Sequence, residues 1–302
     1  MSGRIWIAVA IVVGIIVFHV VGTLYRDYTG WFDAESSTPL NPRVSLLETA
    51  DSHTLHEVRL ASDSGADIVG LLGLPNGPPP YPLIIVQGGY HRGKEAMKLV
   101  GEETLRKGYA LFSMDYRYTG SKDNPVLLYF QVRGGLRDAV RDLCRVMDYF
   151  ETRPDIDPHR EVMVGVSLGA LFGPIMAGVD GRIDYLALIY GGGNLGEIVR
   201  ANAGVHWFLA EIVAGISNLV YAPFEPLRYA DRISPRPLLM IHGTGDEWVP
   251  ARCASEFFDK AGEPKKIIWH DRGHIRSFHA DEIARLVGEV LEWLDEEIPR
   301  TP

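Results

Sequence analysis

Strand-length apolar runs that alternate with helical stretches are the feature that most constrains the fold of this 302-residue chain. The apolar runs lie at 83–87, 109–114, 161–166, 185–190, 237–242 and 266–270. The amphipathic stretches expected to form helices lie at 94–107, 131–152, 168–178, 252–261 and 281–297. Continuous apolar strands separated by helices are typical of a mostly parallel sheet that helices cover on both faces. The sequence therefore predicts an α/β fold.

Two further strands are expected before this alternating region. The segments "LHEVRLAS" at 55–62 and "ADIVGLLGLP" at 66–75 are predicted to pair in an antiparallel hairpin. The prolines of the following "NGPPPYP" cannot continue a strand. We therefore expect one folded domain that covers residues 55–302.

The amino-terminal segment has a different composition. Residues 5–25, "IWIAVAIVVGIIVFHVVGTLY", carry no formal charge and, as a helix, would cover the roughly 30 Å hydrocarbon core of a bilayer. A secretory signal has a shorter apolar stretch and a clearer cleavage site, and a buried core helix usually has a polar face. We predict an uncleaved transmembrane anchor over 1–25. A linker is expected at 26–54, because its "STPLNPR" shows no apolar periodicity.

The compartment is indicated only weakly. The amino terminus and Arg4 lie on one side of the predicted span, and Arg26 and Arg43 lie on the other. The positive-inside rule therefore counts nearly equal positive charge on the two sides and barely favours either orientation. We expect the folded domain to lie outside the cytoplasm. In such a compartment Cys144 and Cys253 would be able to pair, but the sequence does not give the distance between them.

Charge and motif content exclude several function classes. The net charge is −9, and no stretch supplies the clustered Lys and Arg residues that nucleic-acid binding requires. The sequence has no metal-ligand spacing, phosphate-binding glycine loop or dinucleotide fingerprint. We therefore expect no metal, no cofactor and no nucleic-acid partner.

The pentapeptide "GVSLG" places Ser167 between two glycines, after a predicted strand and before a predicted helix. Small neighbours permit a sharp turn that lifts the hydroxyl above the sheet edge, where the helix N-terminus favours developing negative charge. Glycine and serine also favour ordinary turns, which is the alternative interpretation. A nucleophilic serine further needs a base that takes its proton, and an acid that holds this base.

Asp246 and His274 meet this need, because each follows the end of a predicted strand by four residues. The carboxyl ends of parallel strands meet at one edge of a sheet, and the order Ser, Asp, His is typical of successive strand ends. We predict Ser167 as nucleophile, His274 as base and Asp246 as orienting acid. The weaker candidates are the acids Glu247 and Asp271 and the histidines His91, His242, His270 and His279.

These motifs resemble the α/β-hydrolase superfamily, in its dienelactone hydrolase and prolyl oligopeptidase-like branch. The resemblance is carried by "GVSLG", "HGTGDEWVP", "RGH" and "DYRYTGS", and runs from about residue 55 to the C-terminus. It implies an α/β-hydrolase fold, with an oxyanion hole formed by the backbone N–H of Leu168 and that of Gly89 or Tyr90. The family commonly has His-Gly before this second loop, where this chain has Gln87 and Gly88.

Residues 194–232 interrupt the alternation of strands and helices. Apolar residues recur there at helical spacing, which predicts a helix or helix pair. One interpretation is simple packing on the domain. The other is a cap over a substrate pocket, which we expect to involve Trp207, Phe208 and Tyr221 together with His91.

The sequence thus predicts a serine hydrolase that cleaves a small-molecule carboxylic ester through an acyl-enzyme. A peptidase or aminoacyl-amidase of the same fold is an alternative. Peptidases of this branch usually carry a large additional domain, which the residues before 55 are too few to build. A noncatalytic, membrane-tethered binding module is a second alternative, indicated only by Gln87.

Overall fold

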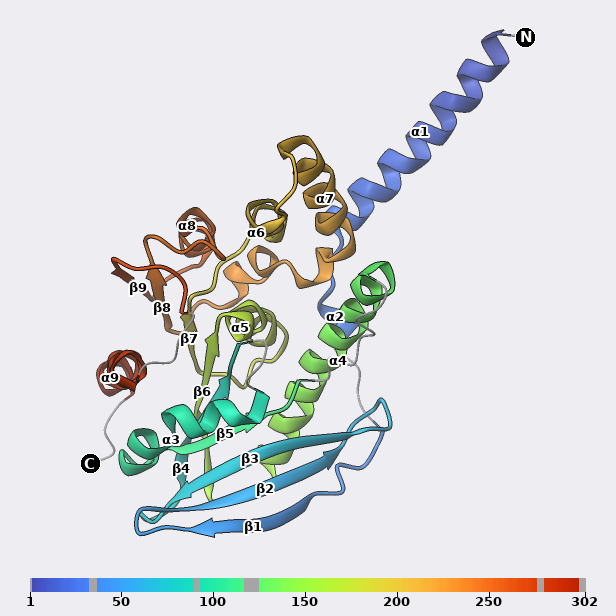
Figure 1. Ribbon diagram of the computed structural model, residues 1–302. Coiled ribbons are helices and arrows are strands. Elements are labelled where there is room, and N and C mark those ends of the chain that lie inside the picture. Colours follow the sequence, from blue (N-terminus) through green and yellow to red (C-terminus); the bar gives the residue numbers. More distant parts are fainter. Residues whose placement is uncertain (1, 33–36, 90–92, 117–124, 276–279, 299–302) are drawn as a thin grey trace.

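The computed structural model describes residues 2–32, 37–89, 93–116, 125–275 and 280–298, with side chains except at 2–12, 16 and 125–133. Within these described residues, the strands form one sheet of nine strands (Figure 1). The strands are β1 (Arg43–Thr49), β2 (His53–Ala61), β3 (Asp67–Pro75), β4 (Tyr81–Gln87), β5 (Ala110–Met114), β6 (Ile156–Val166), β7 (Tyr185–Ile189), β8 (Leu238–Gly243) and β9 (Lys265–His270). The main helices are α1 (Ser2–Tyr25), α3 (Ala96–Arg106), α4 (Pro125–Glu151), α5 (Leu168–Val179), α6 (Leu195–Asn202), α7 (Trp207–Val220), α8 (Ala251–Lys260) and α9 (Ala280–Glu297).

The order of strands in the sheet is β1-β2-β3-β5-β4-β6-β7-β8-β9. In this order, β1, β2, β3 and β5 pair with their neighbours in antiparallel fashion. The remaining pairs, which join β5, β4, β6, β7, β8 and β9, are parallel. In the register of β4 and β6, Gln87 lies opposite Gly165, so the loops that follow these two strands start side by side. The carboxyl ends of all the parallel strands therefore share one edge, where ligands of such sheets bind.

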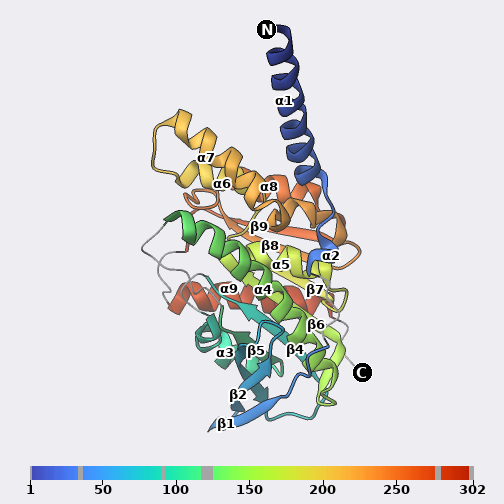
Figure 2. The same cartoon turned by 90° about the vertical axis from the view of Figure 1, so that its right-hand side faces the viewer.

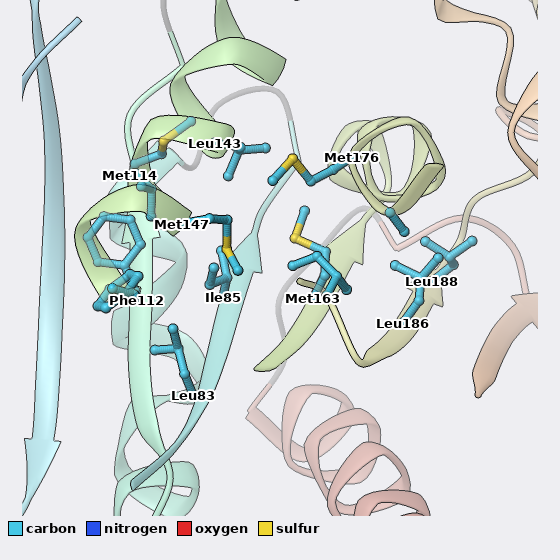
Figure 3. Close-up of a cluster of buried hydrophobic side chains, with 14 of the residues drawn as sticks. Leu83, Ile85, Phe112, Met114, Leu143, Met147, Met163, Met176, Leu186 and Leu188 are labelled. Atoms are coloured by element: carbon cyan, nitrogen blue, oxygen red, sulfur yellow. The ribbon is translucent and has the colours of Figure 1, made fainter. Parts of the chain in front are cut away.

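Helices cover both faces of the sheet, as the alternating sequence predicted. On one face, α4, α5 and α8 bury Leu143, Met176 and Phe257 against the strands, and Figure 3 shows part of this cluster. On the other face, α3 and α9 bury residues such as Leu105 and Leu286. Because successive side chains of a strand point to opposite faces, neighbouring residues of β4 enter different clusters.

The predicted α/β fold with its mostly parallel sheet is confirmed, including the antiparallel β2–β3 hairpin. Both cysteines are free thiols, so they do not pair. Cys144 lies on α4, with its Sγ atom 4.0 Å from the Sδ atom of Met176. Cys253 is buried on α8, and this burial raises the pKa of its thiol to about 11. The Cys253 thiol is therefore not a ready nucleophile at neutral pH.

The segment 194–232 is helical, as predicted. It contains α6 and α7, which pack against each other, followed by three short 3-10 helices, η2 (Ala222–Phe224), η3 (Pro226–Arg228) and η4 (Ala230–Arg232). The outer side of α7 exposes apolar side chains to solvent, including Trp207 and Ile216. Figures 1 and 2 show α1 projecting from the molecule on the side where α6 and α7 lie.

The amino-terminal expectations need correction. Residues 2–25 form helix α1, but none of the helices in the described ranges has both the length and the apolarity needed to cross a membrane. The predicted transmembrane anchor over 1–25 is therefore unsupported. The position of the folded domain outside the cytoplasm stays a prediction.

The linker expected at 26–54 is wrong for much of its length. Residues 43–49 form strand β1, which pairs with β2 from Arg43 to Thr49 with one register shift between Leu46 and Glu48. The short helix α2 (Thr29–Phe32) packs on the domain, where Phe32 is only 2% exposed and its ring lies 5.7 Å from that of Phe224. Backbone pairing and aromatic burial therefore join this segment to the domain, although it shows no apolar periodicity.

Candidate active site

Ser167 occupies a strained turn between β6 and α5. Its φ of 54° and ψ of −110° lie outside the regions that a residue with a Cβ atom ordinarily adopts. A Cβ atom on Gly165 would lie 2.4 Å from the carbonyl oxygen of Gly169, and one on Gly169 would lie 2.0 Å from that of Gln87. The backbone N–H of Ser167 donates to the Ile189 carbonyl of β7 at 2.8 Å. Close backbone packing thus holds Ser167 in this sparsely populated conformation.

The three side chains predicted to act together form a chain, in which His274 lies within hydrogen-bond distance of both Ser167 and Asp246. The Oγ atom of Ser167 lies 2.9 Å from Nε2 of His274. The other ring nitrogen of His274, Nδ1, lies 2.7 Å from Oδ2 of Asp246. The structure thus brings together strand-end residues that lie far apart in the sequence.

Asp246 is held on its other side by the backbone. Its Oδ1 atom accepts the N–H groups of Trp248 and Val249, each at 2.8 Å, and its side chain is completely buried. These two bonds fix the carboxylate plane and leave Oδ2 directed at the imidazole of His274. A buried carboxylate with charge-assisted hydrogen bonds on both oxygens is suited to stabilise an imidazolium ion beside it.

Other candidate acids and histidines have different partners. The ring nitrogen Nε2 of His242 lies 2.9 Å from the Val249 carbonyl, and burial lowers the pKa of His242, so this ring stays neutral behind Asp246. His270 bonds to Glu289 at 2.9 Å. Asp271 accepts the Thr244 hydroxyl at 3.4 Å. None of these groups reaches Ser167, and His91 and His279 lie outside the described residues.

Glu247, the other candidate acid, touches the backbone of the base. Its Oε2 atom accepts the N–H of His274 at 3.2 Å. This contact tethers the loop that carries His274, whereas the ring nitrogen of His274 is bonded to Asp246. Glu247 thus positions the loop and does not replace the orienting acid.

Tyr190 is a site residue that the sequence analysis did not single out. Its buried ring packs edge-on against the ring of His274, with 5.5 Å between ring centroids. Its φ of 56° places it in the left-handed region directly after β7. Burial raises the pKa of Tyr190, so its phenol stays protonated beside the imidazole. Its position at the end of the apolar run 185–190 was the available signal, because the same criterion selected Asp246 and His274.

The expected oxyanion hole is described in part. Leu168 is the first residue of α5, so its N–H has no acceptor within the helix. A Cβ atom on Gly89 would lie 3.7 Å from the Cβ atom of Ser167, which places this glycine beside Ser167. The Tyr116 hydroxyl donates to the Gly88 carbonyl at 2.6 Å and so braces the same loop. Tyr90 lies outside the described residues.

Gln87, which stands where the family commonly has histidine, is fully buried at the end of β4. Its side-chain amide has no hydrogen-bond partner within the described ranges. The carbonyl of Gln87 is the group that forbids a side chain at position 169. Gln87 therefore acts on the site through the packing of its backbone against the turn of Ser167.

The residues expected to line a substrate pocket lie elsewhere. Trp207 and Phe208 at the start of α7 are 68% and 57% exposed, and Tyr221 packs in the aromatic cluster that contains Phe224. An apolar pocket instead lies beside Gly89, between α3 and α9, and none of the three aromatic residues lines it. Their predicted role in a pocket is therefore unsupported by their positions.

Comparison with known proteins assigns the chain to a family. The sequence model of the prolyl oligopeptidase family matches residues 102–300, a range that contains Ser167, Asp246 and His274. The chain belongs to this family. The predicted resemblance to the prolyl oligopeptidase-like branch of the α/β-hydrolases is thereby confirmed.

Curated relatives of this family member are themselves without a stated activity. The uncharacterized protein YfhR of Escherichia coli (strain K12) is 28% identical over 174 residues, which cover 57% of this chain and 55% of that protein. The uncharacterized protein YfhR of Salmonella typhimurium is 27% identical over 172 residues, 56% of either chain. The chain spans about half the length of these relatives.

Solved structures with the same fold include several esterases. The acetyl xylan esterase from Paenibacillus sp. R4 superposes with a TM-score of 0.69 at 19% identity, covering 88% of this chain and 93% of that one. Acetyl xylan esterase 1 from Thermoanaerobacterium sp. has a TM-score of 0.69 at 17% identity, with coverages of 87% and 92%. A cold-adapted esterase from an Arctic intertidal metagenomic library has a TM-score of 0.59 at 18% identity, with coverages of 83% and 99%. At these identities the likeness shows the α/β-hydrolase fold.

Proposed function

We propose that this protein is a serine hydrolase that cleaves a carboxylic ester through an acyl-enzyme. The observation that carries the proposal is the continuous contact from Ser167 Oγ to His274 Nε2 at 2.9 Å and from His274 Nδ1 to Asp246 Oδ2 at 2.7 Å. This arrangement gives the weakly acidic hydroxyl a base, and gives the base an acceptor that sets its tautomer. The esterases among the structural neighbours are consistent with an ester substrate.

In the first half-reaction, His274 takes the proton of Ser167 as Oγ attacks the ester carbonyl carbon. The carbonyl oxygen becomes negative in the tetrahedral intermediate, where the N–H of Leu168 at the start of α5 and the loop of Gly89 are positioned to receive it. Asp246 stabilises the imidazolium ion. His274 then gives its proton to the leaving alkoxide, and the alcohol departs from the acyl-enzyme.

In the second half-reaction, a water molecule takes the place of the alcohol. His274 removes a proton from this water, whose oxygen attacks the acyl carbon. Collapse of the second intermediate breaks the bond to Ser167 Oγ, which recovers a proton from His274. The carboxylic acid leaves and the starting enzyme is restored.

Active-site labelling and ester turnover test the proposal together. A fluorescent fluorophosphonate should label the protein, and p-nitrophenyl acetate should be hydrolysed. Ser167→Ala should abolish labelling and reduce kcat on the order of a million-fold. Ser45→Ala, at an exposed position of β1, is the matched control and should keep both the labelling and the wild-type kcat. Near-normal turnover by Ser167→Ala would contradict the assignment of the nucleophile.

Hydrolysis of an aminoacyl amide is the second candidate, and the family match favours it. The same groups would act, with His274 donating its proton to a leaving amine. Paired p-nitrophenyl esters and aminoacyl p-nitroanilides distinguish the two, because an esterase turns over only the former at a substantial rate. Absence of labelling and of turnover on both substrate types would instead indicate a noncatalytic binding module.

A further inference from the structure

An aliphatic pocket lies under the candidate active site, on the face of the sheet that α3 and α9 cover. Its walls come from β4 and β6 of the sheet and from the two helices, which lie against each other (Figure 1). Representative lining residues are Ile84, Val86, Val164, Leu286 and Val290, all of them buried. The segment of α6 and α7 that the sequence suggested as a cap contributes no residue to this pocket.

The chemistry of the pocket walls is almost entirely hydrocarbon. Thr104 supplies the only side-chain oxygen of the described lining, and its hydroxyl donates to the Val100 carbonyl of the same helix at 2.7 Å. The side chains of the described lining therefore offer a ligand no charge and no hydroxyl proton that is not already donated. Water would find too few polar partners in this pocket. An alkyl chain needs no such partners, and its transfer from solvent into the pocket is favourable because apolar surface is removed from water.

One end of the pocket is lined by residues that adjoin Ser167 and His274. Gly88 and Gly89 line it, and Gly89 is the residue beside Ser167. Val166, which directly precedes Ser167, and Ile275, which directly follows His274, line it as well. An acyl group attached to Ser167 Oγ would thus begin at the mouth of this pocket.

The other end lies between the helices at the surface. Leu99 and Val100 of α3 and Ile283 and Val287 of α9 are half-buried, and they line both this pocket and an outer groove. Charged side chains such as Lys98 and Glu102 border that groove. The pocket is therefore an elongated aliphatic space that extends from the nucleophile toward solvent.

We propose that this pocket binds the acyl chain of the substrate, so that the enzyme prefers linear aliphatic acyl esters to acetyl esters. The inference rests on the proposed ester hydrolysis and adds the substrate class to it. Each methylene group buried in the pocket should raise kcat/KM about fourfold, the ratio that about 0.8 kcal/mol corresponds to. Shape rather than hydrogen bonding selects the chain, because the lining side chains beyond the glycines at the mouth are aliphatic except for Thr104.

A series of p-nitrophenyl esters from acetyl to dodecanoyl tests the proposal on the full chain. For the wild-type protein, kcat/KM should rise from acetyl to octanoyl by at least a hundredfold. Val287→Phe and Val100→Phe place a ring in the half-buried end of the pocket, so each should lower the octanoyl-to-acetyl ratio of kcat/KM at least tenfold. Val44→Phe, at an exposed position of β1 far from the pocket, is the matched control and should keep the wild-type ratio.

A covalent probe locates the chain independently of the variants. A p-nitrophenyl octylphosphonate, in which the octyl group is bonded to phosphorus, should label Ser167. Amide hydrogen exchange in α3 and α9 should be slower in this adduct than in the adduct formed with a p-nitrophenyl methylphosphonate. Reduced exchange confined to α6 and α7 would overturn the proposal, as would a kcat/KM that is flat or falls from acetyl to octanoyl. Either of these results leaves ester hydrolysis intact. Failure of the proposed function looks different, because Ser167 would then take up neither phosphonate and no ester would be hydrolysed.

Discussion

At the scale of single residues, the two oxygens of Asp246 perform different tasks. Oδ1 accepts two backbone N–H groups from the loop after β8, while Oδ2 faces Nδ1 of His274. An acceptor at this position requires that Nδ1 carry the proton, which leaves Nε2 unprotonated toward Ser167. In the proposed mechanism, the carboxylate thus selects the tautomer that can act as a base.

Asp246→Asn tests this selection of the tautomer. The amide of asparagine is able to donate to Nδ1, which would move the proton to Nε2 and leave Ser167 without a base. We expect kcat for p-nitrophenyl acetate to fall about ten-thousand-fold, with the free energy of unfolding changed much less. Initial rates and urea unfolding provide the two measurements. A fall in kcat of less than tenfold would show that Asp246 does not set the tautomer.

The turn around Ser167 gives a second prediction at this scale. Alanine in place of a helical glycine ordinarily stabilises a helix by up to about 1 kcal/mol. At Gly169, however, the new Cβ atom would lie 2.0 Å from the backbone oxygen of Gln87, which no side-chain rotation relieves. We expect Gly169→Ala to lower the free energy of unfolding by about 1–3 kcal/mol. Gly181→Ala, with no atom within 4 Å of the added Cβ, is the control in urea unfolding and should differ little from wild type.

The sequence was informative about some of these residues and silent about others. Position at a strand end selected the three side chains that the structure brings together, because the topology of a parallel sheet converts that position into proximity. Their catalytic roles stay predictions. The packing of Tyr190 against His274 depends on a left-handed residue after β7, and the bracing of Gly88 by Tyr116 depends on the exact path of two loops. The strand-end position of Tyr190 was visible in the sequence, but neither of these two contacts follows from local sequence pattern.

At the scale of elements, the buried strands and amphipathic helices were predictable because each carries its own periodicity. The first strand was not. Every residue of β1 is exposed, and it shows no alternating apolar pattern. Its place in the sheet comes mainly from backbone pairing with β2. Helix α2 was missed for a related reason, since four residues are too few to show helical spacing.

Strand β6 carries a buried acid that makes stability depend on pH. Glu161 is 1% exposed, and burial, together with the nearby Asp184 carboxylate, raises its pKa to about 8 from the ordinary value of 4.5. Between these two pH values the folded protein retains a proton that the unfolded chain releases. Stability from this group is therefore fully present below about pH 4.5, and it declines as the pH rises toward 8.

Glu161→Gln should remove this decline, because glutamine stays neutral across the range. Between pH 5 and pH 8, we expect the free energy of unfolding of the variant to improve relative to that of wild type by about 3–4 kcal/mol, the linkage value for a pKa of about 8 against 4.5. Urea unfolding at a series of pH values gives the measurement. Glu48→Gln, at an exposed position of β1, controls for the loss of one negative charge. Parallel pH profiles for wild type and Glu161→Gln would show that the carboxyl is ionised in the folded protein.

At the scale of the whole molecule, the strand order explains how one edge gathers the site. The loop after β4 supplies Gly89, the loop after β6 supplies Ser167, and the loops after β8 and β9 supply Asp246 and His274. The pairing of β4 with β6 and of β8 with β9 sets two of these loops on each side, and Tyr190 after β7 fills the space between them. The segment before β1 contributes no residue to this arrangement. Its contribution to stability can therefore be measured separately from that of the site.

Two variants of that segment should therefore behave differently. The described side chains of α1 between Val13 and Val21 are largely exposed, and its end is held by Arg228, which donates to the Leu24 and Arg26 carbonyls. Removal of residues 1–25 should lower the free energy of unfolding by at most about 2 kcal/mol and leave p-nitrophenyl acetate turnover within twofold. Phe32→Ala should cost about 3–5 kcal/mol, because this ring is 2% exposed against Phe224. Urea unfolding of both variants decides, and a larger loss from the truncation than from Phe32→Ala would mean that α1, and not α2, anchors the amino-terminal segment to the domain.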